Sequence, residues 1–176
     1  MEPPTSIVGT DTIREIRYAA SNAPRGCFAE IGVYQGGSAF HLWEIAKRQL
    51  RKLYLYDTFS GIPYKGADDS HNAGDFADCS AEEVRTRLPG AIVVEGIFPE
   101  SARMDMSGIA FVHLDCDQYK SYRDAIGFLL PRMARGGIMW FDDSPCLKGA
   151  AKAVSEFFTP ESLYRSSSGK HLAFIP

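Results

Sequence analysis

Short apolar runs alternate regularly with longer segments of helical periodicity along this sequence. Short apolar runs bounded by glycine, proline and polar residues are typical of buried strands, whereas apolar residues three and four apart share one face of a helix. We expect strands at residues 27–33, 53–56, 91–94, 109–114 and 138–141, and helices at 12–22, 38–50, a short stretch from 80, 121–135 and 149–158. Because strands buried on both faces alternate with helices in parallel sheets, the pattern predicts a doubly wound α/β fold.

The last part of the chain departs from this alternation. Residues 163–166 and 171–175 form two strand-like runs with a short connection, which is typical of an antiparallel hairpin. We therefore predict a seven-stranded, mostly parallel sheet that ends in a C-terminal antiparallel hairpin.

Two segments qualify this pattern. We expect Pro131 to kink the helix at 121–135 and Gly136-Gly137 to end it. The polar stretch 61–79, which is rich in Asp and Gly, reads as a loop. A loop of this length inside a compact domain is usually either an active-site lid or disordered.

Length, charge and cysteine content narrow the class of protein. The chain has 176 residues, which suits a single domain over 1–176 with a core of its own. Its formal net charge is −3 without any block of like charges, which argues against a nucleic-acid partner and against a membrane surface. Residues 1–5 lack the features of a signal peptide, and the cysteines form no C-x-x-C pair, so we expect free buried thiols in a cytoplasmic protein.

Polar or glycine-rich residues follow each of the expected parallel strands. The first strand leads into a glycine-rich turn, and the later ones lead into Asp57, Glu95-Gly96, Asp115 and Asp142-Asp143. The carboxyl ends of parallel strands meet at one edge of a sheet, and ligands of doubly wound folds bind outside that edge. We therefore expect an active-site cleft there.

The glycine-rich turn, residues 30–38 (EIGVYQGGS), indicates a nucleoside-type cofactor together with Asp57. The turn lacks the G-x-G-x-x-G spacing and the Gly-Lys-Ser/Thr ending of a P-loop, and Glu30 would repel a pyrophosphate but suits a cationic ligand. Asp57 lies 20 residues beyond Gly37, where nucleotide sites place an acid that binds ribose hydroxyls. The alternatives are a turn that only packs a helix on the sheet and an Asp57 that caps a turn.

Three carboxylates, Asp115, Asp142 and Asp143, are expected to converge at the same edge. One helix and one strand fit into the interval between Asp115 and Asp142, so the two strand ends are neighbours. Like charges repel unless a cation lies between them, and oxygen ligands favour a hard cation, Mg²⁺ first. The alternative is that these acids are ordinary loop and cap residues.

Four segments in this order carry a resemblance to a known family. They are residues 30–38 (EIGVYQGGS), 55–63 (LYDTFSGIP), 114–121 (LDCDQYKS), and Gly136-Gly137 followed by Asp142-Asp143. The set resembles the macrocin O-methyltransferase (TylF/MycF-like) family of class I S-adenosylmethionine (SAM) methyltransferases. The resemblance implies a Rossmann-like class I methyltransferase fold and a metal-dependent O-methyltransferase, often acting on sugar hydroxyls of natural products.

The resemblance also implies roles for individual residues. In the turn after the first strand, the residues that would hold the methionine part of SAM or contact the cofactor beside it are Glu30, Gly32, Tyr34, Gly36, Gly37 and Ser38. Those that would hold the ribose are Asp57, Thr58 and Phe59, and those that would flank the adenine are Ile97 and Phe98. The ligands of Mg²⁺ or another divalent cation would be Asp115, Asp142 and Asp143.

The sequence departs from the family pattern in two places. Residues 115–122 read D-C-D-x-Y-x-S-Y where the family usually reads D-G-D-x-Y-x-S-T. Few residues precede the first strand, whereas family members tend to have N-terminal segments that cover the substrate. We therefore expect an open cleft that a partner subunit of a homodimer could cover, and the macrolide-sugar substrate does not carry over directly.

The expected chemistry is transfer of a methyl group to a hydroxyl of a small molecule, such as a sugar or another natural-product metabolite. We assign Asp115 as the base that takes the hydroxyl proton, unless it is a metal ligand only. His71, in the long loop, is a candidate second base, while His113, inside a strand, is best explained as a hydrogen-bonded core residue.

Two alternatives come from other classes of protein. An NAD(P)-dependent oxidoreductase of Rossmann type would share the glycine turn and Asp57, but no Tyr is followed four residues later by the Lys that short-chain oxidoreductases use. A non-catalytic, methyltransferase-like binding module would have no need of the three metal-binding acids.

Overall fold

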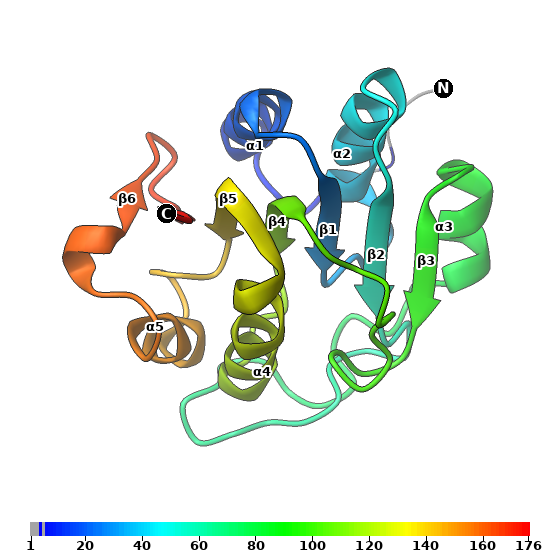
Figure 1. The fold of residues 1–176 in the computed structure, drawn as a ribbon. Helices are drawn as coiled ribbons and strands as arrows, with labels where there is room; N and C mark the ends of the chain where they lie inside the picture. Colours follow the sequence, from blue (N-terminus) through cyan, green and yellow to red (C-terminus); the bar gives the residue numbers. More distant parts are fainter. Residues whose placement is uncertain (1–3, 5) are drawn as a thin grey trace.

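The computed structural model describes residue 4 and residues 6–176, and Figure 1 shows their fold. Residues 1–3 and 5, which underlie the expectation of no signal peptide, lie outside the described part. The helices are α1 (Thr10–Asn22), α2 (Gly37–Arg48), α3 (Ala81–Arg87), α4 (Tyr119–Leu129) and α5 (Lys148–Ser155), with 3-10 turns η1 (Leu130–Arg132) and η2 (Pro160–Ser162). The strands are β1 (Cys27–Ile31), β2 (Leu53–Asp57), β3 (Ile92–Glu95), β4 (Ile109–Leu114), β5 (Met133–Phe141), β6 (Tyr164–Arg165) and β7 (His171–Phe174).

The strands of the described residues form one seven-stranded sheet in the order β3-β2-β1-β4-β5-β7-β6. β1 to β5 pair in parallel, and β7 runs antiparallel to both β5 and β6. The predicted doubly wound α/β fold with a C-terminal antiparallel hairpin is therefore confirmed. The chain reverses its direction of travel across the sheet between β1 and β4, and this switch point is where doubly wound folds bind ligands.

Helices cover both faces of the sheet, and each face has its own core. Successive strand residues point to opposite faces, so Phe28 packs with α1, α2 and α3, whereas its neighbour Ala29 packs with α4 and α5. In Figure 1, α1 and α2 lie together at one side of the sheet, and α4 and α5 lie together elsewhere. The apolar strands are buried on both faces for this reason, and their carboxyl ends remain free to form a site.

The expected helix at 121–135 is wrong in its second half. α4 ends at Leu129, Pro131 lies in the 3-10 turn η1, and Gly136-Gly137 lie inside β5 rather than ending a helix. Pro131 does not kink a helix, because at the start of a helical turn its missing N–H has no partner to lose. A Cβ on Gly137 would lie 2.9 Å from the carbonyl oxygen of Ile109, so this glycine permits the close approach of β4 and β5 at an irregularity in their register.

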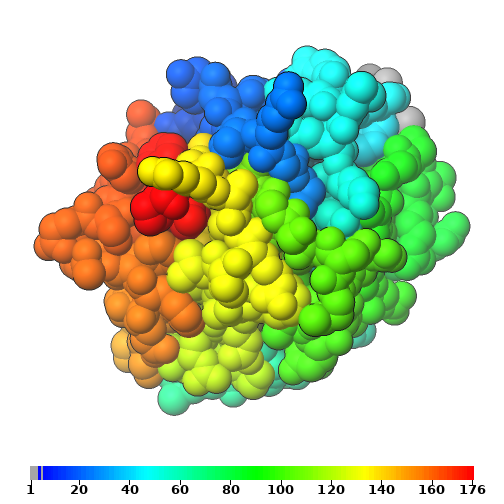
Figure 2. Space-filling view, in the orientation of Figure 1, coloured from blue at the N-terminus to red at the C-terminus, as the bar shows by residue number. Residues whose placement is uncertain are grey.

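The C-terminal hairpin extends the sheet beside β5. Gly136 donates its N–H to the carbonyl oxygen of Ile175 at 2.7 Å, and Ile175 donates to Gly137 at 2.8 Å. Figure 2 shows the C-terminal residues, in red, packed beside the yellow residues of this region and near the blue N-terminal part. The last strands therefore belong to the same sheet as the expected cleft.

Two expectations about the class of protein can be compared with the structure. Across the described residues, helices are too short or too polar to cross a bilayer. The four cysteines are free, as expected, but Cys146 is exposed and the other three are half-buried, so the expectation of buried thiols is wrong.

Candidate active site

A cavity of about 420 Å³ lies at the carboxyl-end edge of the sheet, at the switch point between β1 and β4. This volume is within the range of small-molecule and cofactor sites. Most of the predicted site residues line it: Gly32, Tyr34, Gly37, Ser38, Asp57, Thr58, Ile97, Phe98, Asp115, Asp142 and Asp143. The parallel strand ends are brought together as their common direction predicted.

Three of the predicted cofactor residues lie outside the lining. Glu30 is fully buried behind Ser38, whose hydroxyl donates to Glu30 Oε1 at 2.5 Å. Gly36 is the residue before α2, and its φ of 86° allows the turn to enter the helix. Phe59 packs into the core beneath α1 to α3. These three residues lie behind the residues that line the cavity, and their predicted contacts with a cofactor stay predictions.

Asp57 holds the glycine-rich turn in place. Its Oδ2 accepts the backbone N–H groups of Val33 and Tyr34 at 2.7 and 2.8 Å, and its Oδ1 accepts that of Phe59 at 2.8 Å. This is the turn-capping role that the sequence left open beside ribose binding. The two roles are compatible, because Oδ1 retains acceptor capacity and Asp57 lines the cavity.

Gly32 lets the turn pass directly over the end of β4. Its φ is 85°, and a Cβ at this position would lie 1.8 Å from the carbonyl oxygen of Asp115. Asp115 donates its own N–H to Ile31 at 2.9 Å. Only a residue without a side chain fits here, and the contact joins the turn to the first acid of the expected metal site.

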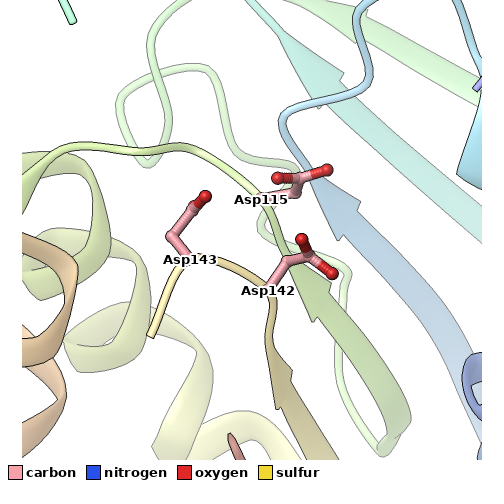
Figure 3. A group of neighbouring side chains, drawn as sticks. All are labelled: Asp115, Asp142 and Asp143. Atoms are coloured by element: carbon pink, nitrogen blue, oxygen red, sulfur yellow. The ribbon is translucent and has the colours of Figure 1, made fainter. Parts of the chain in front are cut away.

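The three acids converge as predicted (Figure 3). Asp115 follows β4, while Asp142 and Asp143 follow the adjacent β5, and one carboxylate oxygen from each lies within 4.8 Å of the others. Burial and the charges of Asp143 and Asp142 raise the pKa of Asp115 well above its usual range. Burial and the charge of Asp117 raise the pKa of Asp143 to about 7. The negative charges of these acids therefore repel one another when ionised, and a bound cation would reduce this repulsion.

Asp142 differs from the other two acids because cationic side chains flank it. Lys170 Nζ lies 2.7 Å from Asp142 Oδ2, and His113 Nε2 lies 3.5 Å from Asp142 Oδ1. Burial would raise the pKa of Asp142, but the hydrogen bonds and charges of His113 and Lys170 outweigh it and lower this pKa to about 2. His113 also contacts Glu30 through Nδ1 at 3.0 Å, so both ring nitrogens have partners, as expected for a core histidine.

The segment 61–79 covers the cavity. Figure 1 shows this connection between β2 and α3 at the edge toward which the arrows of β1, β2 and β3 point. Ile62, His71 and Phe76 line the cavity, and His71 Nε2 lies 3.5 Å from Asp117 Oδ1. The segment therefore lies where a lid over the cavity would lie. A lid was one of the two alternatives, beside disorder, that its length suggested.

Residues 5–165 match the model of the family described as macrocin-O-methyltransferase (TylF). The chain belongs to this family. A curated relative, the 8-demethyl-8-(2,3-dimethoxy-alpha-L-rhamnosyl)-tetracenomycin-C 4'-O-methyltransferase of Streptomyces olivaceus, is 26% identical over 78% of this chain and 62% of its own length. The demethyldecarbamoylnovobiocin O-methyltransferase of Streptomyces niveus is 24% identical over 86% of this chain and 67% of its own.

The solved structure of the O-methyltransferase NovP has the same fold as this member of the TylF family. The two superpose with a TM-score of 0.82 at 22% identity, covering 96% of this chain and 81% of NovP. The chain thus spans about 62% of the length of the first curated relative but nearly all of its own length is matched by a solved methyltransferase fold.

Several lining residues of this TylF-family chain were missed by sequence reasoning. Residues 6–9 line the cavity, so the segment before α1 covers part of the cleft that we expected to be open. Lys170 also lines it, because the antiparallel pairing of Phe141 with His171 places Lys170 opposite Asp142. The position of Lys170 just before a hairpin strand could be predicted from the sequence. Its position opposite Asp142 could not, because that requires knowing which strand β7 pairs with.

Asp69 ties the lid segment to the helices beside it. Its Oδ1 accepts the N–H of Tyr119 at 2.8 Å, and its Oδ2 accepts the N–H of Gly66 at 2.7 Å. A Cβ on Gly149 would lie 2.3 Å from Asp69 Oδ1, so the start of α5 packs closely on the same carboxylate. Asp68, the preceding residue, pairs with Lys148 and Lys152.

We expect Asp69→Ala to open the lid segment locally. Removing the carboxylate leaves two backbone N–H groups unpaired, at a cost of about 1–3 kcal/mol. Hydrogen exchange of the amides in 61–79 should therefore speed up by about tenfold or more, while exchange in β1 and β4 stays unchanged. Asp68→Asn is the matched comparison and should have a smaller effect, because its ion pairs with lysines are solvent-exposed. Equal exchange in both variants would show that Asp69 does not hold the segment.

The unfolding free energy of the ligand-free protein should fall as pH rises from 5 to 8. The pKa of Asp143 is about 7 and that of Asp117 about 6, both above the ordinary value of 3.8, mainly because of burial. A raised pKa means that ionising the group costs more in the folded state, so stability is lost as pH rises from about 4 through the folded pKa. The raised pKa of His113, which contacts Asp142 and Glu30, acts in the same direction.

Thermal unfolding across this pH range measures the effect. Asp143→Asn should flatten the dependence, because the amide does not ionise. Added Mg²⁺ should raise the midpoint more at pH 8 than at pH 5, since cations bind the ionised acids. A midpoint that increases with pH in the ligand-free wild type would contradict the assignment of a strained acidic cluster.

Proposed function

We propose that this protein is a SAM-dependent, divalent-cation-dependent O-methyltransferase that acts on a hydroxyl group of a small molecule, with the whole site in one domain over 1–176. The observation that carries the proposal is a single cavity lined both by the glycine-rich turn after β1 and by the three converging acids after β4 and β5. A cofactor and a cation bound in this cavity would both lie next to the acceptor molecule.

The residues around the turn suit the cationic methionine part of SAM. The Oε2 atom of Glu30 is buried and has no hydrogen-bond partner among the described residues. A buried acceptor of this kind is costly unless a ligand or water completes it. Asp57 lines the cavity and its Oδ1 could accept from a ribose hydroxyl, while Ile97 and Phe98 line the cavity where the adenine would pack. When bound, SAM would supply a methyl group on a positively charged sulfur.

The acid cluster suits a hard divalent cation. Its donors are carboxylate oxygens from neighbouring strand ends, which is the donor type that Mg²⁺ prefers. Burial and the neighbouring carboxylates raise the pKa values of Asp115 and Asp143, so a positive charge bound beside them would be favourable. A bound cation would lower the pKa of an acceptor hydroxyl and orient it.

Two groups can take the proton of the acceptor hydroxyl. Asp115 lies in the cavity, and burial together with the charges of Asp143 and Asp142 raises its pKa, which makes its carboxylate a stronger base. His71 is the second candidate, because the lid places its ring in the cavity 3.5 Å from the Asp117 carboxylate. The residues of the turn and the lid would fix the acceptor in line with the methyl group and exclude water.

The names of the relatives support a class of acceptor. One curated relative is named as the O-methyltransferase of a rhamnosyl-tetracenomycin C and the other as that of demethyldecarbamoylnovobiocin. We propose that this chain likewise methylates a hydroxyl of a sugar or another natural-product metabolite. We also propose a cytoplasmic protein without nucleic-acid or membrane partners, and a homodimer as its assembly.

The test of the proposed function is a combined binding and turnover experiment. Calorimetry should detect SAM and S-adenosylhomocysteine (SAH) but not NAD. A screen of sugars, catechols and other hydroxylated metabolites with SAM should yield a methylated product that requires Mg²⁺ and disappears with EDTA. Binding of NAD alone would favour the oxidoreductase alternative, and SAM binding without any turnover would favour the non-catalytic module. Turnover that survives EDTA would remove the cation from the proposal.

A further inference from the structure

We propose that His113 is a positioning residue that holds the cofactor turn and the acid cluster in register with each other. This inference rests on the proposed function, because it assigns a task to a side chain behind both parts of that site. The geometry that carries it is a buried row in which the His113 ring lies between Glu30 and Asp142.

The sheet itself creates this row. Glu30 on β1 pairs directly with His113 on β4, and His113 pairs with Trp140 on β5. Residues two apart along a strand share a face, so Asp142, which continues beyond Trp140, returns to the same face as His113. A side chain at the centre of three adjacent strands therefore reaches both the turn and the acids.

The contacts on the two sides of the ring are separate. His113 Nδ1 lies 3.0 Å from Glu30 Oε1, and His113 Nε2 lies 3.5 Å from Asp142 Oδ1. Glu30 and His113 are fully buried and Asp142 is nearly so, which leaves little room for water to replace the ring. Ionised carboxylates only accept hydrogen bonds, so the ring donates to both of them when both of its nitrogens are protonated.

The two carboxylates belong to different parts of the proposed site. Glu30 Oε1 also accepts from Ser38, while Glu30 Oε2 has no partner among the described residues and is the orphaned acceptor behind the cofactor turn. The other oxygen of Asp142 is fixed by Lys170 at 2.7 Å, so His113 and Lys170 together set the direction of this carboxylate. His113 thus positions one acid for the cofactor and one for the cation.

Two substitutions separate the two contacts. In His113→Asn the amide nitrogen takes roughly the place of Nδ1, so the Glu30 contact is kept and the Asp142 contact is lost. In His113→Gln the amide reaches roughly the place of Nε2, so the Asp142 contact is kept and the Glu30 contact is lost. A purely structural role would affect both affinities to the same extent in each variant.

The experiment is calorimetry on the intact protein with SAH and, separately, with Mg²⁺. We expect His113→Asn to weaken Mg²⁺ binding by about tenfold or more with SAH affinity changed less than about threefold, and His113→Gln to give the reverse, within the usual range for residues that orient ligands. His41→Gln is the control, since His41 lies on α2, contacts Arg17 and should change neither affinity. Equal losses in both His113 variants, or no loss in either, would overturn the inference.

A measurement on the wild type covers the case in which these variants do not fold. Nitrogen-15 spectra of the histidine rings, with the other three histidines assigned by substitution, should show the His113 Nδ1 signal moving mainly with SAH and the Nε2 signal mainly with Mg²⁺. If neither His113 nitrogen signal shifts when SAH or Mg²⁺ is added, the inference is overturned. A wild type that binds SAH but no divalent cation would instead overturn the metal part of the proposed function, and this inference with it.

Discussion

Asp142→Asn should reduce methyl transfer by about 100- to 1,000-fold while SAH affinity changes less than about threefold. The amide keeps the size of the side chain and one acceptor oxygen but removes the negative charge that lies between His113 and Lys170. Two acids would then remain for the cation, which weakens its binding and the orientation of the acceptor. Initial rates with saturating Mg²⁺, together with calorimetry for SAH and for Mg²⁺, measure the three effects.

The matched control for this prediction is Asp105→Asn. Asp105 is an exposed acid that pairs with Arg103 and lies outside the cavity, so its loss should leave turnover and both affinities unchanged. Turnover near the wild-type rate in Asp142→Asn would show that this acid is not a metal ligand. A loss of SAH binding as large as the loss of turnover would show that the substitution disturbs the cofactor turn instead.

Gly32→Ala should destabilise the protein by about 3 kcal/mol or more, and thereby lower its thermal midpoint by about 6–12 °C. The new Cβ would overlap the carbonyl oxygen of Asp115 at 1.8 Å, and this atom is backbone in the middle of the sheet edge. The φ of 85° adds the strain of a left-handed conformation. Because relief requires the turn to move away from β4, SAH affinity should fall as well.

Gly90→Ala separates the two sources of strain. Gly90 has a φ of 90°, but nothing lies within 4 Å of where its Cβ would be. Its substitution should therefore cost only the conformational part, about 1 kcal/mol, and should leave SAH affinity unchanged. Equal thermal midpoints for the two variants would mean that the turn has room to move at little cost.

Local sequence patterns predicted the element order because burial of the strands on both faces leaves a strong apolar signal. They failed at residues 130–137, where proline and two glycines suggested the end of a helix. There the pairing of β5 with β4, which the close approach at Gly137 permits, stabilises a strand instead. Tertiary pairing overrides local propensity when the gain in packing and hydrogen bonds is larger than the few tenths of a kcal/mol per residue that propensity supplies.

Some residues of the candidate site could likewise be predicted from the sequence, and others could not. Residues that directly follow parallel strands were predictable, because strand direction alone brings Asp57, Asp115 and Asp142 to one edge. The lid contacts of Asp69 and the approach of Lys170 were not, since each depends on where a loop or an antiparallel strand returns to the sheet. The second role of Asp57, as the cap of the glycine-rich turn, became visible only with the distances to Val33 and Tyr34.

The doubly wound fold and the family could be recognised from the amino-acid sequence alone, because strand periodicity and the four ordered segments are local properties of the chain. The sequence also determined which chemical groups stand at the strand ends. How these groups meet depends on the three-dimensional fold: His113 lies between Glu30 and Asp142, Lys170 reaches Asp142, and residues 6–9 and the lid segment line the cavity. Hydrogen bonds and charge interactions act over a few ångströms between residues far apart in the chain, and these short distances exist only once the strands have paired.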